Sequence, residues 1–134
     1  MQTPNTQTTM LPPLPSKKEK REAKITPLVE KYFLTQFPSS VIVEVKATKT
    51  NTIPLSAVKP HQLQALKDAR SPEGIVHKMS DMGRILQPAD FWMFKNSQSF
   101  VIACFLKERI CLAINPHKWI GARVDSECDF NFNI

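Results

Sequence analysis

A short apolar segment carries the two residues whose types and spacing could do chemistry, Glu44 and Lys46. Side chains alternate between the faces of a strand, so this spacing puts a carboxylate and an ammonium side by side. The opposite face is then apolar and predicts core: Val41, Val43, Val45 and Ala47. A fixed carboxylate can hold a divalent metal, and an adjacent lysine can steady a phosphate or a hydroxide, which is what phosphodiester hydrolysis requires. An ordinary ion pair is the alternative explanation of the same spacing.

A metal site for phosphodiester cleavage also needs a second carboxylate close to Glu44. No aspartate precedes Glu44, since the first in the chain is Asp68. The best partner is Asp90, which opens an apolar strand directly after a proline turn and would point toward the edge of the sheet. An aspartate that only caps the turn is the alternative.

The composition predicts one basic, folded domain. A chain of 134 residues with 42% hydrophobic residues has room for one ordinary core. The net charge of +6 favours polyanionic partners, nucleic acid first, although a soluble protein that happens to be basic fits as well. Three cysteines without a CxxC motif suggest neither a zinc site nor a disulfide framework. No segment approaches the ~18 apolar residues of a membrane span, so we expect no membrane partner and an intracellular, cytoplasmic location.

The N-terminal region differs in composition from the rest of the chain. Residues 1–16 are rich in Thr, Gln, Asn and Pro and predict a disordered tail, which leaves 17–134 as the domain. The proline-rich end of this tail could dock a partner, with a plain linker as the alternative. The charge run 17–24 reads as a solvated helix start or as a flexible arm that touches phosphates.

Two helices are predicted on either side of the Glu44 strand. Residues 25–37 form the first, with Thr26 as N-cap, Pro27 as the first helical residue and Pro38 as the end. Its expected apolar stripe consists of Leu28, Tyr32, Phe33, Leu34 and Phe37. The second helix is expected over about 60–70 and should turn three residues to the core: Leu63, Leu66 and Ala69.

The remaining elements are mostly strands. Besides 41–47, the strand-like segments are 75–79, 90–94, 99–106 and 109–114. The connections at 96–97 and 107–108 are consistent with hairpins, and 115–119 predicts a short closing helix. No clear period is seen after Val124. This order predicts an α/β protein with a mixed sheet covered by helices.

The run Glu44-Val45-Lys46, taken together with a Pro-x-Asp strand, resembles the PD-(D/E)XK nuclease superfamily. More closely, residues 41–78 are similar to bacterial and phage Holliday junction resolvases. The similarity consists of Glu-Val-Lys-Ala-Thr-Lys, a Pro-Leu pair, a His-Gln pair that opens a helix and a Gly-Ile pair that opens a strand. The resemblance implies a restriction-endonuclease-like fold and a metal-dependent DNA endonuclease that acts on branched DNA. It further implies a homodimer in the cytoplasm of a prokaryote or a phage-infected cell.

The resemblance also implies roles for individual residues. Asp90 and Glu44 would bind Mg²⁺, with Mn²⁺ as a substitute, while Lys46 would position the attacking water. Gln62 would contact water, metal or the scissile phosphate, unless it is simply a polar residue in the first helical turn. Auxiliary roles fall to Glu30, Lys78, Ser80 and Asp81, for which a solvated helix position (Glu30) or a strand-end turn (Lys78 to Asp81) is the alternative. DNA contacts are expected from Lys49, Lys59 and Arg84.

The order of the motifs departs from the family pattern. The metal-binding aspartate usually precedes the Glu-x-Lys strand, whereas Asp90 follows it here, so the site would be permuted. Since space and not chain order makes a site, the nuclease hypothesis stands. The alternative is a non-catalytic nucleic-acid-binding or nuclease-inhibiting protein on the same scaffold.

Overall fold

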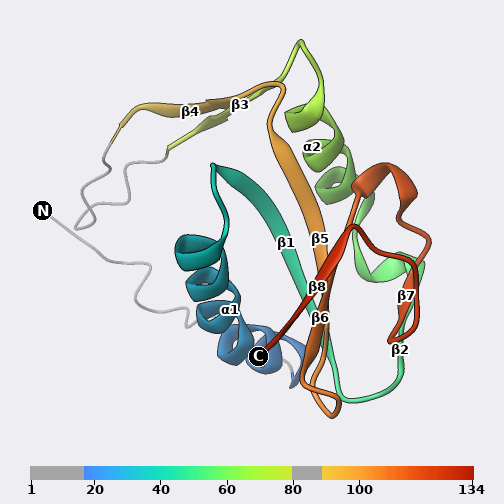
Figure 1. Ribbon diagram of the computed structural model, residues 1–134. Helices are drawn as coiled ribbons and strands as arrows, with labels where there is room; N and C mark the ends of the chain where they lie inside the picture. The colour runs from blue at the N-terminus through green and yellow to red at the C-terminus, as the bar shows by residue number, and fades with distance from the viewer. Residues whose placement is uncertain (1–16, 80–88) are drawn as a thin grey trace, which may run out of the picture.

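The computed structural model describes residues 17–79 and 89–134 of the chain (Figure 1). Within these residues, two α-helices and a four-stranded sheet make up the body. The helices are α1 (Lys17–Gln36) and α2 (Pro60–Arg70). The sheet is formed by β1 (Val41–Thr48), β5 (Gln98–Phe105), β6 (Ile110–Ile114) and β8 (Phe130–Asn133). The predicted tail 1–16 lies outside the described residues.

The sheet is mixed, as the sequence predicts for an α/β fold. The strand order is β1-β5-β6-β8, in which β1 runs parallel to β5 and the other pairs are antiparallel. Two further sheets have two strands each. One joins β2 (Thr52–Ile53) to β7 (Ala122–Arg123), and the other joins β3 (Ile75–Lys78) to β4 (Phe91–Phe94). Two 3₁₀ helices complete the elements: η2 (Leu55–Ala57) and η3 (Pro116–Lys118).

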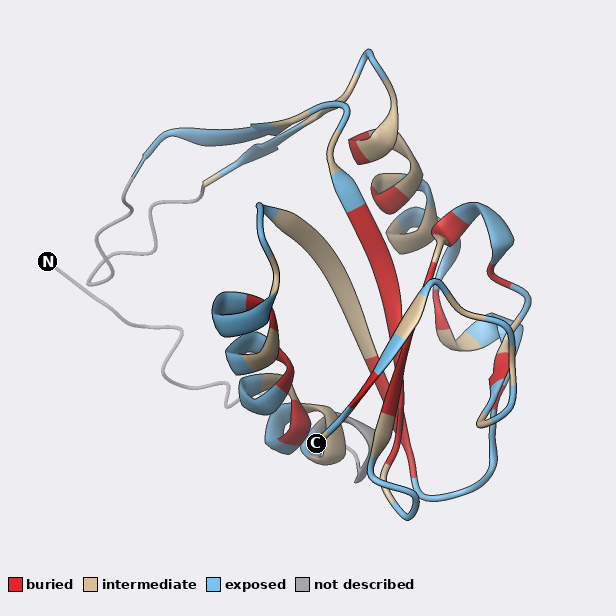
Figure 2. Ribbon diagram, viewed as in Figure 1, coloured by how far each residue is buried: buried red, intermediate tan, exposed pale blue. Residues whose placement is uncertain are grey.

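The helices cover opposite faces of the four-stranded sheet (Figure 1). Alternate residues of β5 belong to two separate hydrophobic clusters because strand side chains alternate in direction. Phe100 and Ile102 pack with α1, whereas Val101 and Ala103 pack with α2. Figure 2 shows the resulting burial of β5 and β6 along most of their length. Neither described helix has the length and apolar character that a membrane crossing requires.

The first helix begins earlier than predicted. It starts at Lys17, so the charge run forms its first turns, and Thr26 is an interior residue and not an N-cap. The Thr26 hydroxyl donates to the Glu22 carbonyl at 2.6 Å, a bond that only an already formed helix offers. Pro27 likewise lies inside the helix and was not its first residue. The prediction took the Thr-Pro pair as the start of the helix. The structure shows that the helix accommodates this pair in its interior.

The longer helix also presents a different stripe from the predicted one. Its buried positions are Ile25, Val29 and Phe33, which follow the i, i+4, i+8 spacing of one helix face. Leu28 and Leu34 are 45% and 85% exposed, so the prediction that they face the core was wrong. The second helix meets its prediction, since Leu66 and Ala69 are buried and Leu63 packs against their cluster.

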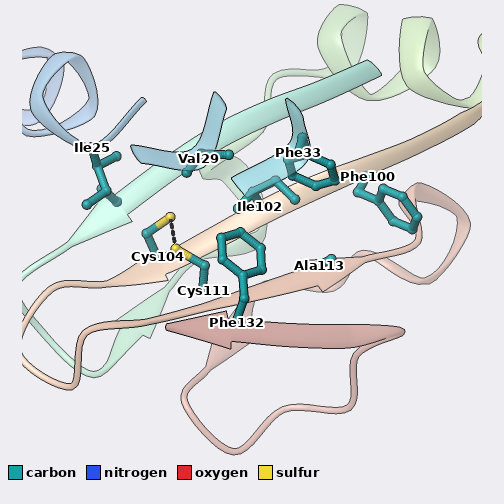
Figure 3. Close-up of a cluster of buried hydrophobic side chains, with 10 residues drawn as sticks. Ile25, Val29, Phe33, Phe100, Ile102, Cys104, Cys111, Ala113 and Phe132 are labelled. Atoms are coloured by element: carbon teal, nitrogen blue, oxygen red, sulfur yellow. Dashed lines mark hydrogen bonds between the residues drawn. The ribbon is translucent and has the colours of Figure 1, made fainter. Parts of the chain in front are cut away.

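The C-terminal strand β8 was missed because the tail was read as aperiodic. In the structure Phe130 and Phe132 alternate with two asparagines, and β8 pairs with β6. Phe132 is buried, and its ring stacks on Tyr32 of α1 with centroids 3.8 Å apart. Figure 3 shows Phe132 in the cluster between α1 and the sheet. The tail therefore completes the core on the α1 side.

The strand β4 does not form the predicted hairpin with β5. It pairs antiparallel with β3, while the 107–108 connection does join β5 to β6 as expected. The reason lies in the turn before β5, which is attached to the end of α2. The Asn96 N–H donates to the Ser71 carbonyl, and the Ser97 N–H donates to the Ala69 carbonyl, both at 3.0 Å. These bonds direct β5 into the main sheet, so β4 pairs with β3 instead.

Cys104 and Cys111 are core residues, as predicted. They lie opposite each other on β5 and β6, fully buried, with their sulfurs 2.6 Å apart (Figure 3). The hydrogen bond between the two thiols, together with burial, raises the pKa of Cys104 above its ordinary value. The thiol therefore stays protonated and behaves as a small apolar side chain.

The burial pattern predicts how stability is distributed over the leucines. Leu112 on β6 is 2% exposed, so Leu112→Ala should lower the free energy of unfolding by about 2–5 kcal/mol. The same change at Leu34, which is 85% exposed, should alter it by no more than ~0.5 kcal/mol. Urea unfolding followed by circular dichroism measures both, and equal losses would contradict the arrangement of the core.

Candidate functional site

The Glu44 strand has the two faces that the sequence predicts. Ala47 is buried in the cluster under α1, and Val41, Val43 and Val45 pack against the same cluster. The other face of β1 turns toward α2, where Ile42 packs against the second cluster. Glu44 and Lys46 follow Ile42 on this face, because residues two apart on a strand share a face. Their partners across the parallel ladder are Val101 and Ala103, both fully buried.

Glu44 and Lys46 form an ion pair at the border of the α2-side core. The Lys46 Nζ lies 3.1 Å from the Glu44 Oε2. The Lys46 side chain is only 8% exposed, whereas Glu44 is 28% exposed. Because an ammonium loses its hydration when buried, the carboxylate is what makes the buried position of Lys46 tolerable. The pair thus holds one charge inside the protein and leaves its partner in contact with solvent.

The position of β1 in the sheet keeps this pair accessible. β1 is an outer strand of the four-stranded sheet and has β5 on one side only. Lys46 also lines a hollow of about 300 Å³, together with the end of β1 and the connection that follows it. Lys46 is thus a buried lysine that also borders a hollow at the edge of the sheet.

Asp90, the predicted second carboxylate, lies in another part of the fold. It immediately precedes β4 in the β3–β4 ribbon, where its carbonyl accepts the Met79 N–H at 2.9 Å. The outer end of this ribbon lies away from β1 in Figure 1. Asp90 is exposed, and no group of three or more His, Cys, Asp or Glu that could hold a metal occurs within 17–79 and 89–134. The described geometry thus brings Glu44 and Lys46 together but does not add Asp90.

Gln62 has a structural task at the start of α2. Its side-chain carbonyl accepts the backbone N–H of Lys59 at 3.1 Å, which satisfies a donor just before the helix. The side chain is partly buried. This bond corresponds to the first-turn alternative, in which Gln62 is a polar residue that serves the start of the helix.

The predicted auxiliary residues are scattered. Glu30 is exposed on α1 and lines an apolar hollow of about 760 Å³ that His77 and Trp92 of the ribbon also line. Lys78 ends β3, exposed and opposite Phe91. Three further predicted residues lie outside the described part of the chain: Ser80, Asp81 and Arg84.

Two predicted DNA contacts lie on the connection between β1 and α2. Lys49 directly follows β1, and Lys59 directly precedes α2. Both are exposed, as a residue that meets a phosphate backbone has to be. They carry positive charge at either end of the segment that borders the Lys46 hollow.

Arg21 is a residue of this region that the sequence does not single out. It lines the same hollow as Lys46, although it comes from α1. In the sequence it is one member of the charge run 17–24, and only the position of the helix shows which member turns toward the sheet edge. The signal that could have found it is helical spacing, since Arg21 precedes the buried Ile25 by one turn.

Comparisons with protein-family models, with curated proteins and with solved structures give no significant match. The resemblance to resolvases therefore rests on the sequence motifs alone.

The ion pair itself can be tested by a mutant cycle. Glu44→Ala should cost about 1–3 kcal/mol of unfolding free energy, because it leaves the Lys46 ammonium buried without its acceptor. The double variant Glu44→Ala/Lys46→Met should recover most of this loss, since it removes the buried charge too. Urea unfolding of Glu44→Ala, Lys46→Met, the double variant and the wild type gives the coupling energy, and additive effects would show that the pair does not couple.

Proposed function

We propose that the protein is a metal-dependent endonuclease that hydrolyses phosphodiester bonds in branched DNA, with the four-way junction as its main substrate. The observation that carries the proposal is the buried Lys46 ammonium, held 3.1 Å from Glu44 on an outer strand, in a residue that also lines a hollow. The net charge of +6 and the exposed Lys49 and Lys59 support a polyanionic substrate.

Glu44 is the residue that would hold Mg²⁺, with Mn²⁺ as a substitute. It fits this role in part, because its carboxylate is partly exposed and Mg²⁺ often binds through one or two carboxylates together with substrate phosphates. When bound, the metal supplies Lewis-acid activation of water and of the phosphoryl oxygens. Asp90 remains a proposed second ligand, although it lies in the ribbon.

Lys46 would act on the charge that develops during cleavage. Its ammonium is already desolvated and already oriented by Glu44, so no reorganisation is needed when a phosphate arrives. A donor in such a setting stabilises the pentavalent phosphorus more than an exposed lysine can. It can also orient the attacking water by a hydrogen bond.

Cleavage of a labelled four-way junction and of the matching duplex tests this proposal, each in Mg²⁺, Mn²⁺ or EDTA. We expect metal-dependent, junction-selective cleavage that falls about 10²–10³-fold in Lys46→Met, the usual cost of losing a charge-stabilising donor. Methionine fills the same space without a charge, so the fold should survive. Lys95→Met is the matched control, because Lys95 is exposed and lies before β5, at the opposite end of β1 from Lys46.

A non-catalytic nucleic-acid-binding or nuclease-inhibiting protein is the second candidate. The observation that favours it is the separation of Asp90 from the Glu44 pair between two different sheets. Under this alternative the junction binds tightly and salt-sensitively but is not cleaved in any metal. That outcome in the assay above would overturn the nuclease proposal.

A homodimer is part of the proposal, because a two-fold junction needs paired cuts. The surface that supports it is one face of the β3–β4 ribbon, where Val76, Phe91 and Met93 are more than half exposed. An isolated two-stranded ribbon is barely stable in water, so a second copy packed on this face would stabilise it. The ribbon is the exposed strand pair in Figure 2.

Sedimentation equilibrium tests this association. The wild type should sediment as a dimer of the 15.2 kDa chain, and Met93→Glu should give monomers because it places a charge on the apolar face. Ile120→Glu is the control, since Ile120 is 84% exposed next to β7 and outside the ribbon. A monomeric wild type at all concentrations would contradict the dimer.

A further inference from the structure

The hollow beside Lys46 lies where three parts of the chain meet. Arg21 reaches it from α1, Lys46 and Thr48 come from the end of β1, and Thr52 and Ser56 belong to the connection toward α2. Its volume of about 300 Å³ is at the lower end of the ~300–1,000 Å³ typical of small-molecule sites. The hollow is thus large enough for a phosphate group with some water, but not for a folded macromolecule.

The charged residues that line this hollow in the described part of the chain are both cations. They are Arg21 and Lys46, and no carboxylate of the described residues lines it. Glu44 offsets the charge of Lys46 from outside the lining, and Arg21 supplies the second cation. Lys24, one helical turn further along α1, is exposed and adds positive charge to the same helix. These features favour an anion as the occupant.

Arg21 shows the clearest sign of a missing acceptor. Its Nε is buried and has no hydrogen-bond partner among the residues that the structure describes, as is also true of the Oε2 of the neighbouring Glu22. A buried donor without a partner costs about 1–3 kcal/mol, which a ligand oxygen would recover if the Arg21 side chain turned its Nε toward the hollow. The guanidinium is a planar fork that matches two oxygens of one phosphate. The orphaned donor and the positive hollow are independent observations that point to the same ligand.

Hydrogen bonds hold the turn beside the polar side of the hollow. The Thr48 and Thr50 hydroxyl oxygens lie 2.8 Å apart, and the Thr50 N–H donates to the Thr48 oxygen at 3.0 Å. The Thr50 hydroxyl in turn donates to the Thr52 carbonyl. These bonds fix the turn after β1, so the hollow exists before any ligand arrives, as a binding site with a low ordering cost requires.

We infer that this hollow binds a backbone phosphate of a nucleic-acid strand, with Arg21 as its main contact; the inference rests on the proposed function of the neighbouring Glu44–Lys46 pair. Lys46 both lines the hollow and forms the ion pair with Glu44. A phosphate in the hollow would therefore lie directly beside a phosphate at the Glu44–Lys46 pair. Successive phosphates of one strand are spaced for such neighbouring contacts. Arg21 is therefore a positioning residue that fixes the strand in register.

The test is a titration of the ¹⁵N-labelled full chain, followed by NMR in EDTA so that no cleavage occurs. Inorganic phosphate and a short single-stranded oligonucleotide are added separately. We expect both to shift the amide signals of residues 48–56, and Arg21→Gln to weaken both effects at least tenfold. In parallel, the oligonucleotide affinity of Arg21→Gln should show a salt slope lower by about 1, as expected for one lost phosphate contact. Lys95→Gln should titrate like the wild type.

Each outcome separates this inference from the proposed function. Shifts with inorganic phosphate alone would show a small-anion site and overturn the nucleic-acid assignment. No shifts with either probe, or an Arg21→Gln variant that titrates like the wild type, would overturn the inference while junction cleavage could still stand. If both probes shift the signals but the protein cleaves no junction, the phosphate site is supported and the nuclease proposal is overturned. Because Arg21 makes no described bond through Nε, its replacement should leave the protein folded, with the signal dispersion of the wild type.

Discussion

The burial of β5 on both faces constrains everything else in the fold. From Ser99 to Phe105 the strand is inaccessible to solvent or nearly so, which requires a cover on each side and a strand along each edge. The helix α1 covers one face and α2 the other, while β1 and β6 occupy the edges. A shift of β1 by one residue would turn Glu44 and Lys46 into the α1-side core, so the same burial also fixes the direction of the candidate site.

One polar group inside this strand is satisfied by α2. The Ser99 hydroxyl donates to the Leu66 carbonyl at 2.6 Å, and the Arg70 guanidinium donates to the Ser99 carbonyl. Arg70 also lies over the Phe100 ring, 5.2 Å from its centroid. Desolvation lowers the pKa of Arg70, and Asp129 partly offsets this, but the group stays charged. The end of α2 is thereby attached to the start of β5, which also anchors the turn that diverts β4 into the ribbon.

Sequence reasoning succeeded where the determining interactions are local. The alternation along β1 and the Leu66–Ala69 spacing of α2 can be read from neighbouring residues, and both are confirmed. It failed where partners are distant in the chain. The choice of β3 over β5 as the partner of β4 depends on bonds between the turn at Asn96 and the end of α2, which no local pattern contains. The strand β8 is an intermediate case, because its Phe-Asn alternation was visible but only pairing with β6 makes it a strand.

The candidate site likewise combines residues placed by local interactions with a residue placed by long-range packing. Glu44 and Lys46 share a face for local reasons, whereas Arg21 joins them only because α1 starts early and passes the end of β1. A buried lysine on an outer strand has a structural explanation too, since inward-pointing charges prevent edge-to-edge pairing. That explanation accounts for Lys46 and its partner Glu44. It gives no reason for a second cation with an orphaned buried donor beside a hollow that no carboxylate of the described residues lines. An edge that only had to be protected would place Arg21 in water, where its Nε needs no ligand.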